Sequence, residues 1–322
     1  MRNILARGLT FALVCFISLA TATASFSQAS LRKAMDTDND GKADYTIFRP
    51  STNIWYTLKT NGTPIYTYFG IASTDMMAPG DFDGDGKGDV AVFRETDGDW
   101  YWMNSSDGTF HAAHWGSPGD EPVGRDYDGD GKTDLAVVRR TNGAMIWYVL
   151  RSSDGNFTQT EFGAATDFTA PGDYDGDGKF DFTIQRPGVL KTSQAVFHSR
   201  SAATGNVTAT VWGLSGDLVA PGDYDGDGKT DYAVLREGDT PTSNLEWYIL
   251  KSGGGTIVEV FGLTGTDLNV QNDYDGDGKT DIAIFRGDAA GQFWTKNSSD
   301  GSVGVIMWGT TNDYPVASYD TH

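Results

Sequence analysis

Short apolar runs alternate with turn-forming residues along the chain. One unit consists of an apolar segment at 169–172, an acidic Gly-rich loop at 173–181 and a second apolar segment at 182–186. A third segment is centred on an aromatic pair such as Trp147-Tyr148, and the fourth ends in Phe-Gly or Trp-Gly. Runs of this length between Gly, Asn and Asp turns are typical of strands. The pattern therefore predicts four strands per unit.

The unit is repeated six times. A motif of the form D-x-D-x-D-G-K-x-D begins at Asp36, Asp81, Asp126, Asp173, Asp223 and Asp273, at intervals of 45, 45, 47, 50 and 50 residues. A repeat of this length is typical of propellers and solenoids. We expect an all-β fold: a six-bladed β-propeller of four-stranded blades, with seven blades as the alternative. Residues 30–322 would form this single domain.

Two features of the strands fit propeller blades. Adjacent large residues such as Trp100-Tyr101-Trp102 suit a sheet that is buried on both faces. The fourth strands carry Thr and charge, which suits a solvent-facing edge protected from further strand pairing. We expect the repeated tryptophans to pack in the core, although stacking on sugar rings is an alternative.

The repeated acidic loop has the ligand pattern of a calcium site. Three Asp at alternate positions, a Gly for the sharp turn and an Asp at position nine place hard oxygens around one point. An EF-hand is excluded because position twelve is Ile or Val rather than Glu. An Asp/Gly-rich turn that binds nothing is the simpler alternative, but six intact copies favour about six Ca²⁺ ions. The carbonyl of the lysine would be a ligand, with its side chain directed to water.

The predicted ligands occupy positions one, three, five, seven and nine of each loop. They are Asp36, Asp38, Asp40, Lys42 and Asp44; Asp81, Asp83, Asp85, Lys87 and Asp89; Asp126, Asp128, Asp130, Lys132 and Asp134; Asp173, Asp175, Asp177, Lys179 and Asp181; Asp223, Asp225, Asp227, Lys229 and Asp231; and Asp273, Asp275, Asp277, Lys279 and Asp281.

With these loops and Phe-Gly strand ends, the sequence resembles the FG-GAP/VCBS repeat family, known from the propeller head of integrin alpha chains and from exported bacterial proteins. The resemblance covers residues 31–320. Integrin-type repeats place Gly-Ala-Pro after the second strand, whereas these units place Arg there. This departure, and the absence of an inserted ligand-binding domain, argue against transferring integrin ligands to this chain.

The arginines predict a second regular contact. Five loops are preceded by an Asp six residues earlier, and each Arg lies five residues beyond its loop's last Asp. Since the loop joins two antiparallel strands, Asp75 should meet Arg94 as a structural pair. For the first unit, Asp313 near the C-terminus is the matching acid. We therefore predict that the C-terminal segment supplies the innermost strand of the first blade and places Asp313 beside Arg49.

Charge and the first residues indicate where the protein acts. There are 24 basic and 44 acidic residues, a net charge of −20, which disfavours nucleic acid and anionic lipid as partners.

The first residues have the pattern of a signal peptide over 1–24, with cleavage as late as 29 as an alternative. Arg2 and Arg7 precede an apolar run at 9–20, and small residues follow it. We expect no membrane span after cleavage and a secreted or cell-surface location, with the periplasm as an alternative. Cys15 lies in the signal, so the mature chain would have no disulfide.

The sequence favours binding over catalysis. No Gly-x-Ser-x-Gly elbow is present, and the predicted loops use 24 of the 44 acids. His111 and His114 have an odd separation on a strand, which sends them to opposite faces, and His198 replaces the Tyr of a Trp-Tyr pair. The Asn-x-Ser/Thr sequences are explained by turn chemistry, with glycosylation as the alternative. We expect a non-enzymatic binding or adhesion module for an extracellular carbohydrate or protein. The alternatives are a lyase-like, polysaccharide-processing enzyme and a structural surface component.

Overall fold

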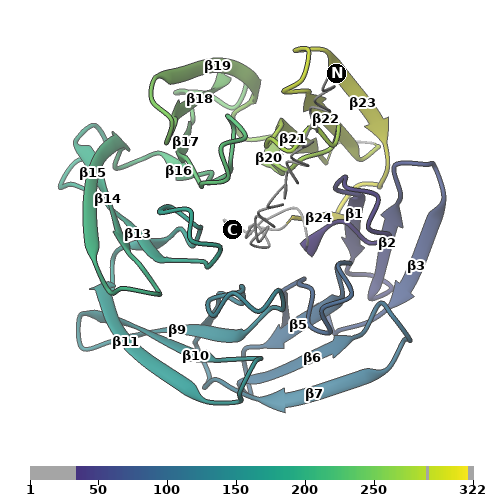
Figure 1. Cartoon of the computed structure of the whole chain (residues 1–322). Coiled ribbons are helices and arrows are strands. Elements are labelled where there is room, and N and C mark those ends of the chain that lie inside the picture. Colours follow the sequence, from purple (N-terminus) through teal and green to yellow (C-terminus); the bar gives the residue numbers. More distant parts are fainter. Residues whose placement is uncertain (1–33, 288–289, 318–322) are drawn as a thin grey trace, which may run out of the picture.

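The structure, a computed structural model, describes residues 34–287 and 290–317. The 24 strands form six antiparallel four-stranded sheets arranged as blades around a central axis (Figure 1). This confirms the six-bladed propeller and excludes the seven-bladed alternative. The predicted signal peptide lies outside the described residues. In the described part of the chain, no helix has the length and apolar character that a membrane span requires.

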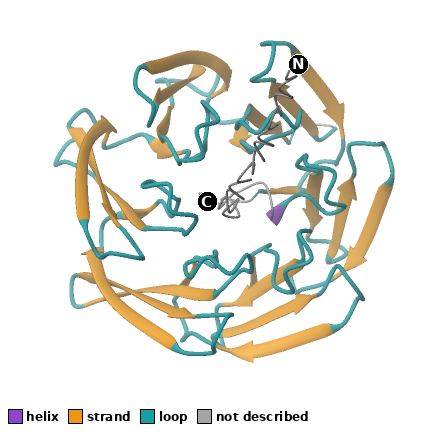
Figure 2. Ribbon diagram, in the orientation of Figure 1, coloured by secondary structure: helices purple, strands orange, loops and turns teal. Residues whose placement is uncertain are grey.

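Each blade runs from an inner strand at the axis to an outer strand at the rim (Figure 2). From inside to outside, the first three blades are β24 (Tyr314–Val316), β1 (Tyr45–Arg49), β2 (Ile54–Leu58) and β3 (Pro64–Tyr68); β4 (Asp75–Met77), β5 (Val90–Arg94), β6 (Asp99–Met103) and β7 (Phe110–His114); and β8 (Glu121–Pro122), β9 (Leu135–Thr141), β10 (Ala144–Leu150) and β11 (Phe157–Ala164).

The last three blades follow the same order. They are β12 (Phe168–Thr169), β13 (Phe182–Arg186), β14 (Gln194–Arg200) and β15 (Val207–Leu214); β16 (Leu218–Val219), β17 (Tyr232–Arg236), β18 (Asn244–Leu250) and β19 (Thr256–Leu263); and β20 (Asp267–Asn269), β21 (Ile282–Arg286), β22 (Gln292–Lys296) and β23 (Val303–Met307).

The ring is closed by the C-terminal strand, as the sequence predicted. β24 pairs antiparallel with β1, with Phe48 opposite Tyr314 and Thr46 opposite Val316. The first blade is therefore built from both ends of the described chain, and β1 has a hydrogen-bonded neighbour on each side. Closure of this kind removes an unpaired inner edge that would otherwise be open to pairing with another chain.

The core lies between the blades and contains the repeated aromatic residues. Trp100, Trp147 and Trp247 are fully buried, which confirms their predicted packing role. Their indole N–H groups donate to backbone carbonyls near the end of the fourth strand, at 2.9 Å in each case. A buried indole needs such a partner. On the rim, alternate residues of the fourth strands are exposed, as expected for a solvent-facing edge.

Candidate metal centre

Each acidic loop (36–44, 81–89, 126–134, 173–181, 223–231 and 273–281, called the first to sixth loops) folds around its own first aspartate. Asp81 Oδ1 accepts the N–H of Gly84 at 2.7 Å, and Oδ2 accepts that of Gly86 at 3.1 Å. Gly86 has φ +86°, a conformation that L side chains rarely adopt, which explains a glycine at position six. The same two bonds recur in the third to sixth loops, and Asp36 accepts two backbone bonds in the first.

The ninth-position aspartate ties the loop to the turn between the third and fourth strands. In the third loop, Asp134 Oδ2 accepts the N–H of Tyr127 at 2.9 Å and Oδ1 accepts that of Ser152 at 2.7 Å. All six loops have this pair of bonds, and the exposed fraction of the aspartate is 2% or less throughout. The ninth position therefore fixes the loop on the rigid blade.

Burial makes these carboxylates costly to ionise without a cation. Desolvation is the largest influence on Asp134 and Asp181 and raises the pKa of each to about 7. It also raises the pKa of Asp44 and Asp89 to about 6. Neighbouring aspartates act in the same direction, because like charges disfavour the charged form. A cation among these groups would relieve both effects.

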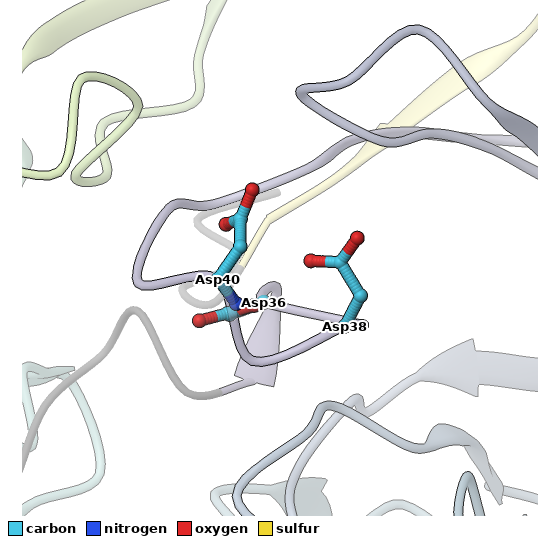
Figure 3. Close-up of side chains that lie close together, drawn as sticks. All are labelled: Asp36, Asp38 and Asp40. Carbon is cyan, nitrogen blue, oxygen red and sulfur yellow. Dashed lines mark hydrogen bonds between the residues drawn. The ribbon is translucent and has the colours of Figure 1, made fainter.

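The loops bring carboxylates close enough to share one ion. In the first and second loops, positions one, three and five offer oxygen atoms within 4.8 Å of one another, and in the third, fourth and fifth loops positions one, three and nine do so. Figure 3 shows Asp36, Asp38 and Asp40 gathered at the turn of the first loop. Asp38 Oδ1 and Asp225 Oδ1 are buried with no hydrogen-bond partner, which leaves an acceptor available for a cation. Clusters of hard oxygens suit Ca²⁺. The lysine carbonyls stay a prediction.

A ring of backbone hydrogen bonds connects the six loops. In each loop the N–H at position eight donates to the carbonyl of the first-position aspartate in the preceding loop, at 2.6 to 2.8 Å. The donors and acceptors are Thr133 to Asp81, Phe180 to Asp126, Thr230 to Asp173, Thr280 to Asp223, Ala43 to Asp273 and Gly88 to Asp36. The candidate sites are therefore parts of one closed structure, which the sequence analysis did not foresee.

Side-chain size is matched at five of the six junctions between neighbouring loops, the exception being the one with Phe180 at position eight and Arg125 before the preceding loop. Thr133 packs so closely against Gly80 that a Cβ on that glycine would lie 2.5 Å from Thr133 Oγ1. Gly172 faces Thr230 and Gly222 faces Thr280 with the same tightness. Where the residue at position eight is small, a larger residue stands directly before the preceding loop. Gly88 of the second loop meets the first loop, which Met35 precedes, and Ala43 of the first loop meets the sixth loop, which Asn272 precedes.

Five of the six seventh-position lysines also contact the neighbouring loop. They were expected to direct their side chains to water, but each is half-buried. A Cβ built on Gly84 would lie 2.8 Å from Lys132 Cε, so the lysine stem crosses the preceding loop at its fourth position. Four further lysine–glycine pairs repeat this contact: Lys179 with Gly129, Lys229 with Gly176, Lys279 with Gly226 and Lys42 with Gly276.

The predicted Arg–Asp pairs form at the opposite ends of the same strands. Arg49 binds Asp313 through Nε and Nη2, both at 2.8 Å, and Arg94 binds Asp75 in the same way at 2.7 and 3.0 Å. The remaining pairs are Arg139 with Asp120, Arg186 with Asp167, Arg236 with Asp217 and Arg286 with Asp267. Five of these guanidinium groups also lie over an aromatic ring of the third strand, at 4.2 to 5.4 Å.

The fourth blade departs from this pattern. His198 stands where the other blades place the ring beneath the arginine, and the Arg186 side chain is 47% exposed, against 20–35% for the other five. Burial, and secondarily Arg186, lower the pKa of His198. Gln185 is fully buried with neither amide atom hydrogen-bonded, in a position that is Phe, Val or Leu elsewhere.

The two histidines of the second blade do not form a joint site. His111 and His114 lie on opposite faces of β7, as predicted: His111 stacks on Trp102 with ring centroids 5.1 Å apart, whereas His114 Nδ1 lies 2.7 Å from Asp99.

Comparison with known proteins supports the repeat and the fold. Residues 36–92 and 126–184 match the sequence profile of the FG-GAP-like repeat. Among solved structures, a triple arginine-to-alanine mutant of AofleA from Arthrobotrys oligospora is similar, with 9% identity and a TM-score of 0.53 over 90% of this chain and 91% of that one. The dihydro-heme d1 dehydrogenase NirN in complex with DHE has 10% identity and a TM-score of 0.44 over 85% of this chain and 75% of that one. A search of curated proteins found no significant match. At 9% identity, the first likeness concerns the fold alone.

Proposed function

Because the chain is an FG-GAP repeat β-propeller, we propose that it is an exported, calcium-stabilised binding or adhesion module. Its ligand is an extracellular carbohydrate or protein. The observation that carries this proposal is the six-fold repetition of the same polar groups, with acidic loops at one end of the strands and Arg–Asp pairs at the other. Repeated polar groups favour recognition of a ligand that itself repeats, because weak contacts add through multivalency.

Calcium is the cation that best fits the loops. Aspartates at positions one, three, five and nine, with the carbonyl at position seven, would hold it, and an all-oxygen donor set favours Ca²⁺ over softer metals. The ions would supply charge neutralisation and cross-links rather than chemistry: six divalent cations offset 12 of the negative charges gathered by 24 loop aspartates. Without metal, the carboxylates within each loop would repel one another. This repulsion would weaken the ring of hydrogen bonds that connects the loops.

The exported location is supported by the first residues. Basic residues followed by the apolar run at 9–20 and small residues form a secretory pattern. Millimolar calcium outside cells suits sites that bind with dissociation constants of about 10⁻⁴ to 10⁻³ M, as extracellular modules commonly do. We therefore place the mature protein outside the cytoplasm, either secreted or at the cell surface.

A binding screen tests the proposal. The mature chain, in calcium and after chelation, is applied to arrays of glycans and extracellular matrix proteins. We expect reproducible binding to one ligand class in calcium and its loss on chelation, together with loss of the native fold by circular dichroism. Failure to bind any ligand by protein that is folded and calcium-loaded would contradict the recognition function.

The fourth blade favours one alternative, a lyase-like enzyme that acts on acidic polysaccharides. Its exposed Arg186, with His198 beside it, breaks the six-fold symmetry, and an active site is expected to do so. Incubating the protein with acidic polysaccharides and following ultraviolet absorbance detects the unsaturated products of such a reaction. Their appearance would establish catalysis and contradict the proposal of binding alone.

A further inference from the structure

Hydroxyl groups from the turn between the third and fourth strands contact the acidic loop of the same blade. In the third blade, Ser152 Oγ donates to Asp130 at 2.9 Å and Ser153 Oγ donates to Asp128 at 2.6 Å. The second and sixth blades have the same two contacts, from Ser105 and Ser106 and from Ser298 and Ser299. The first and fifth blades have one each, from Thr60 and Ser252.

The contacts follow a rule of position. The first turn residue reaches the fifth-position aspartate and the second reaches the third-position aspartate. These two aspartates lack the burial that fixes the ninth-position aspartate, although the fifth-position carboxylate also accepts the N–H of the lysine two residues later. In the third loop, for example, Asp130 is exposed while Asp134 is fully buried.

The fourth blade lacks both hydroxyls. Its turn places Ala202 and Ala203 where the third blade has Ser152 and Ser153. The backbone bond to the ninth-position aspartate is kept, with the Ala202 N–H donating to Asp181 at 3.1 Å. The fourth loop therefore has its anchor but not the two side-chain contacts.

We propose that the turn hydroxyls are positioning residues that set the calcium affinity of each loop, and that the fourth loop is the weakest of the six sites. This inference rests on the calcium binding proposed above. A hydroxyl that donates to one lone pair of a carboxylate restricts its rotamers and leaves its remaining lone pairs for the ion. Loss of such a supporting hydrogen bond commonly weakens metal binding by about 10- to 100-fold.

Equilibrium dialysis of the full mature chain with radioactive calcium counts the sites by affinity. The wild type is expected to bind its last equivalent at a calcium concentration about tenfold or more above the others. Ala202→Ser with Ala203→Ser should strengthen that equivalent. Ser152→Ala with Ser153→Ala should add a second weak one, and Ser152→Thr with Ser153→Thr should retain tight binding, as Thr60 supplies the hydroxyl in the first blade.

Two controls separate positioning from folding and from the calcium proposal itself. Thr158→Ala removes an exposed hydroxyl from β11 and should leave the binding curve unchanged. Circular dichroism at saturating calcium must be the same for all variants. If the wild type binds calcium but neither swap changes the curve, the positioning role is wrong and the calcium proposal stands. If the wild type binds no calcium, the calcium proposal is itself wrong.

Discussion

Gly80→Ala tests whether the tight contact between neighbouring loops stabilises the ring. The new Cβ would lie 2.5 Å from Thr133 Oγ1 and 2.8 Å from Thr133 Cγ2, against about 3.5–4.0 Å for a normal contact, so one side must retreat by about 1 Å. Thr133 cannot rotate away freely, because its branched side chain is stiff and its Oγ1 accepts the N–H of Asp81 at 3.0 Å.

The magnitude follows from two opposing effects. Overpacking of this kind costs about 1–3 kcal/mol, and replacing glycine recovers about 0.4–1 kcal/mol by restricting the unfolded chain. We expect a net loss of about 1–2 kcal/mol in the free energy of unfolding. For a chain of this size that corresponds to a fall in Tm of about 2–6 °C, measured by differential scanning calorimetry in calcium.

A double-mutant cycle identifies the cause. Thr133→Gly places a glycine at position eight, as Gly88 already does where it meets the first loop beside Met35. The second substitution should therefore relieve the clash that Gly80→Ala creates. The two changes should be non-additive by about 1–2 kcal/mol. Gly287→Ala is the matched control, since among the described residues its Cβ would meet Phe285 alone, at 3.4 Å. Equal stability of Gly80→Ala and wild type, or strict additivity of the pair, would refute the reasoning.

Three further outcomes are expected. Calcium at about 1 mM should raise Tm, since each site with a Kd of about 10⁻⁴ to 10⁻³ M adds about 0.4–1.4 kcal/mol, and an unchanged Tm after chelation would count against calcium. Because the folded state lowers the pKa of His198, this residue stabilises the fold above pH 6.5 and loses that effect as the pH falls. His198→Tyr should abolish that acid sensitivity and add about 0.5–1 kcal/mol by stacking under Arg186, which Tm at pH 5 and pH 8 would show. Gln185→Leu, which copies Leu235 of the fifth blade, should gain about 1–3 kcal/mol by removing two buried unpaired groups, and a lower denaturation midpoint in urea would contradict this.

The sequence was sufficient to predict contacts whose geometry is local or follows from antiparallel pairing. In the third to fifth loops, positions one, three and nine converge because a few residues and one glycine determine the turn. Asp75 meets Arg94 because both are nearly equidistant from the loop that joins their strands. Ring closure was predicted on the same grounds, since Asp313 completes a pattern that five other units already display.

Tertiary structure alone decided the contacts between repeats and between distant parts of one blade. The hydrogen bond from Thr133 to Asp81 joins residues in two blades, and periodicity does not show which face of one loop meets the next. Ser153 reaches Asp128 only because the turn at the end of the third strand folds back over the loop. The polar residue at 185 is visible in the sequence, but its lack of partners depends on the packing around it. Repetition determines what each blade is, whereas the close packing of blades around the axis determines which groups touch.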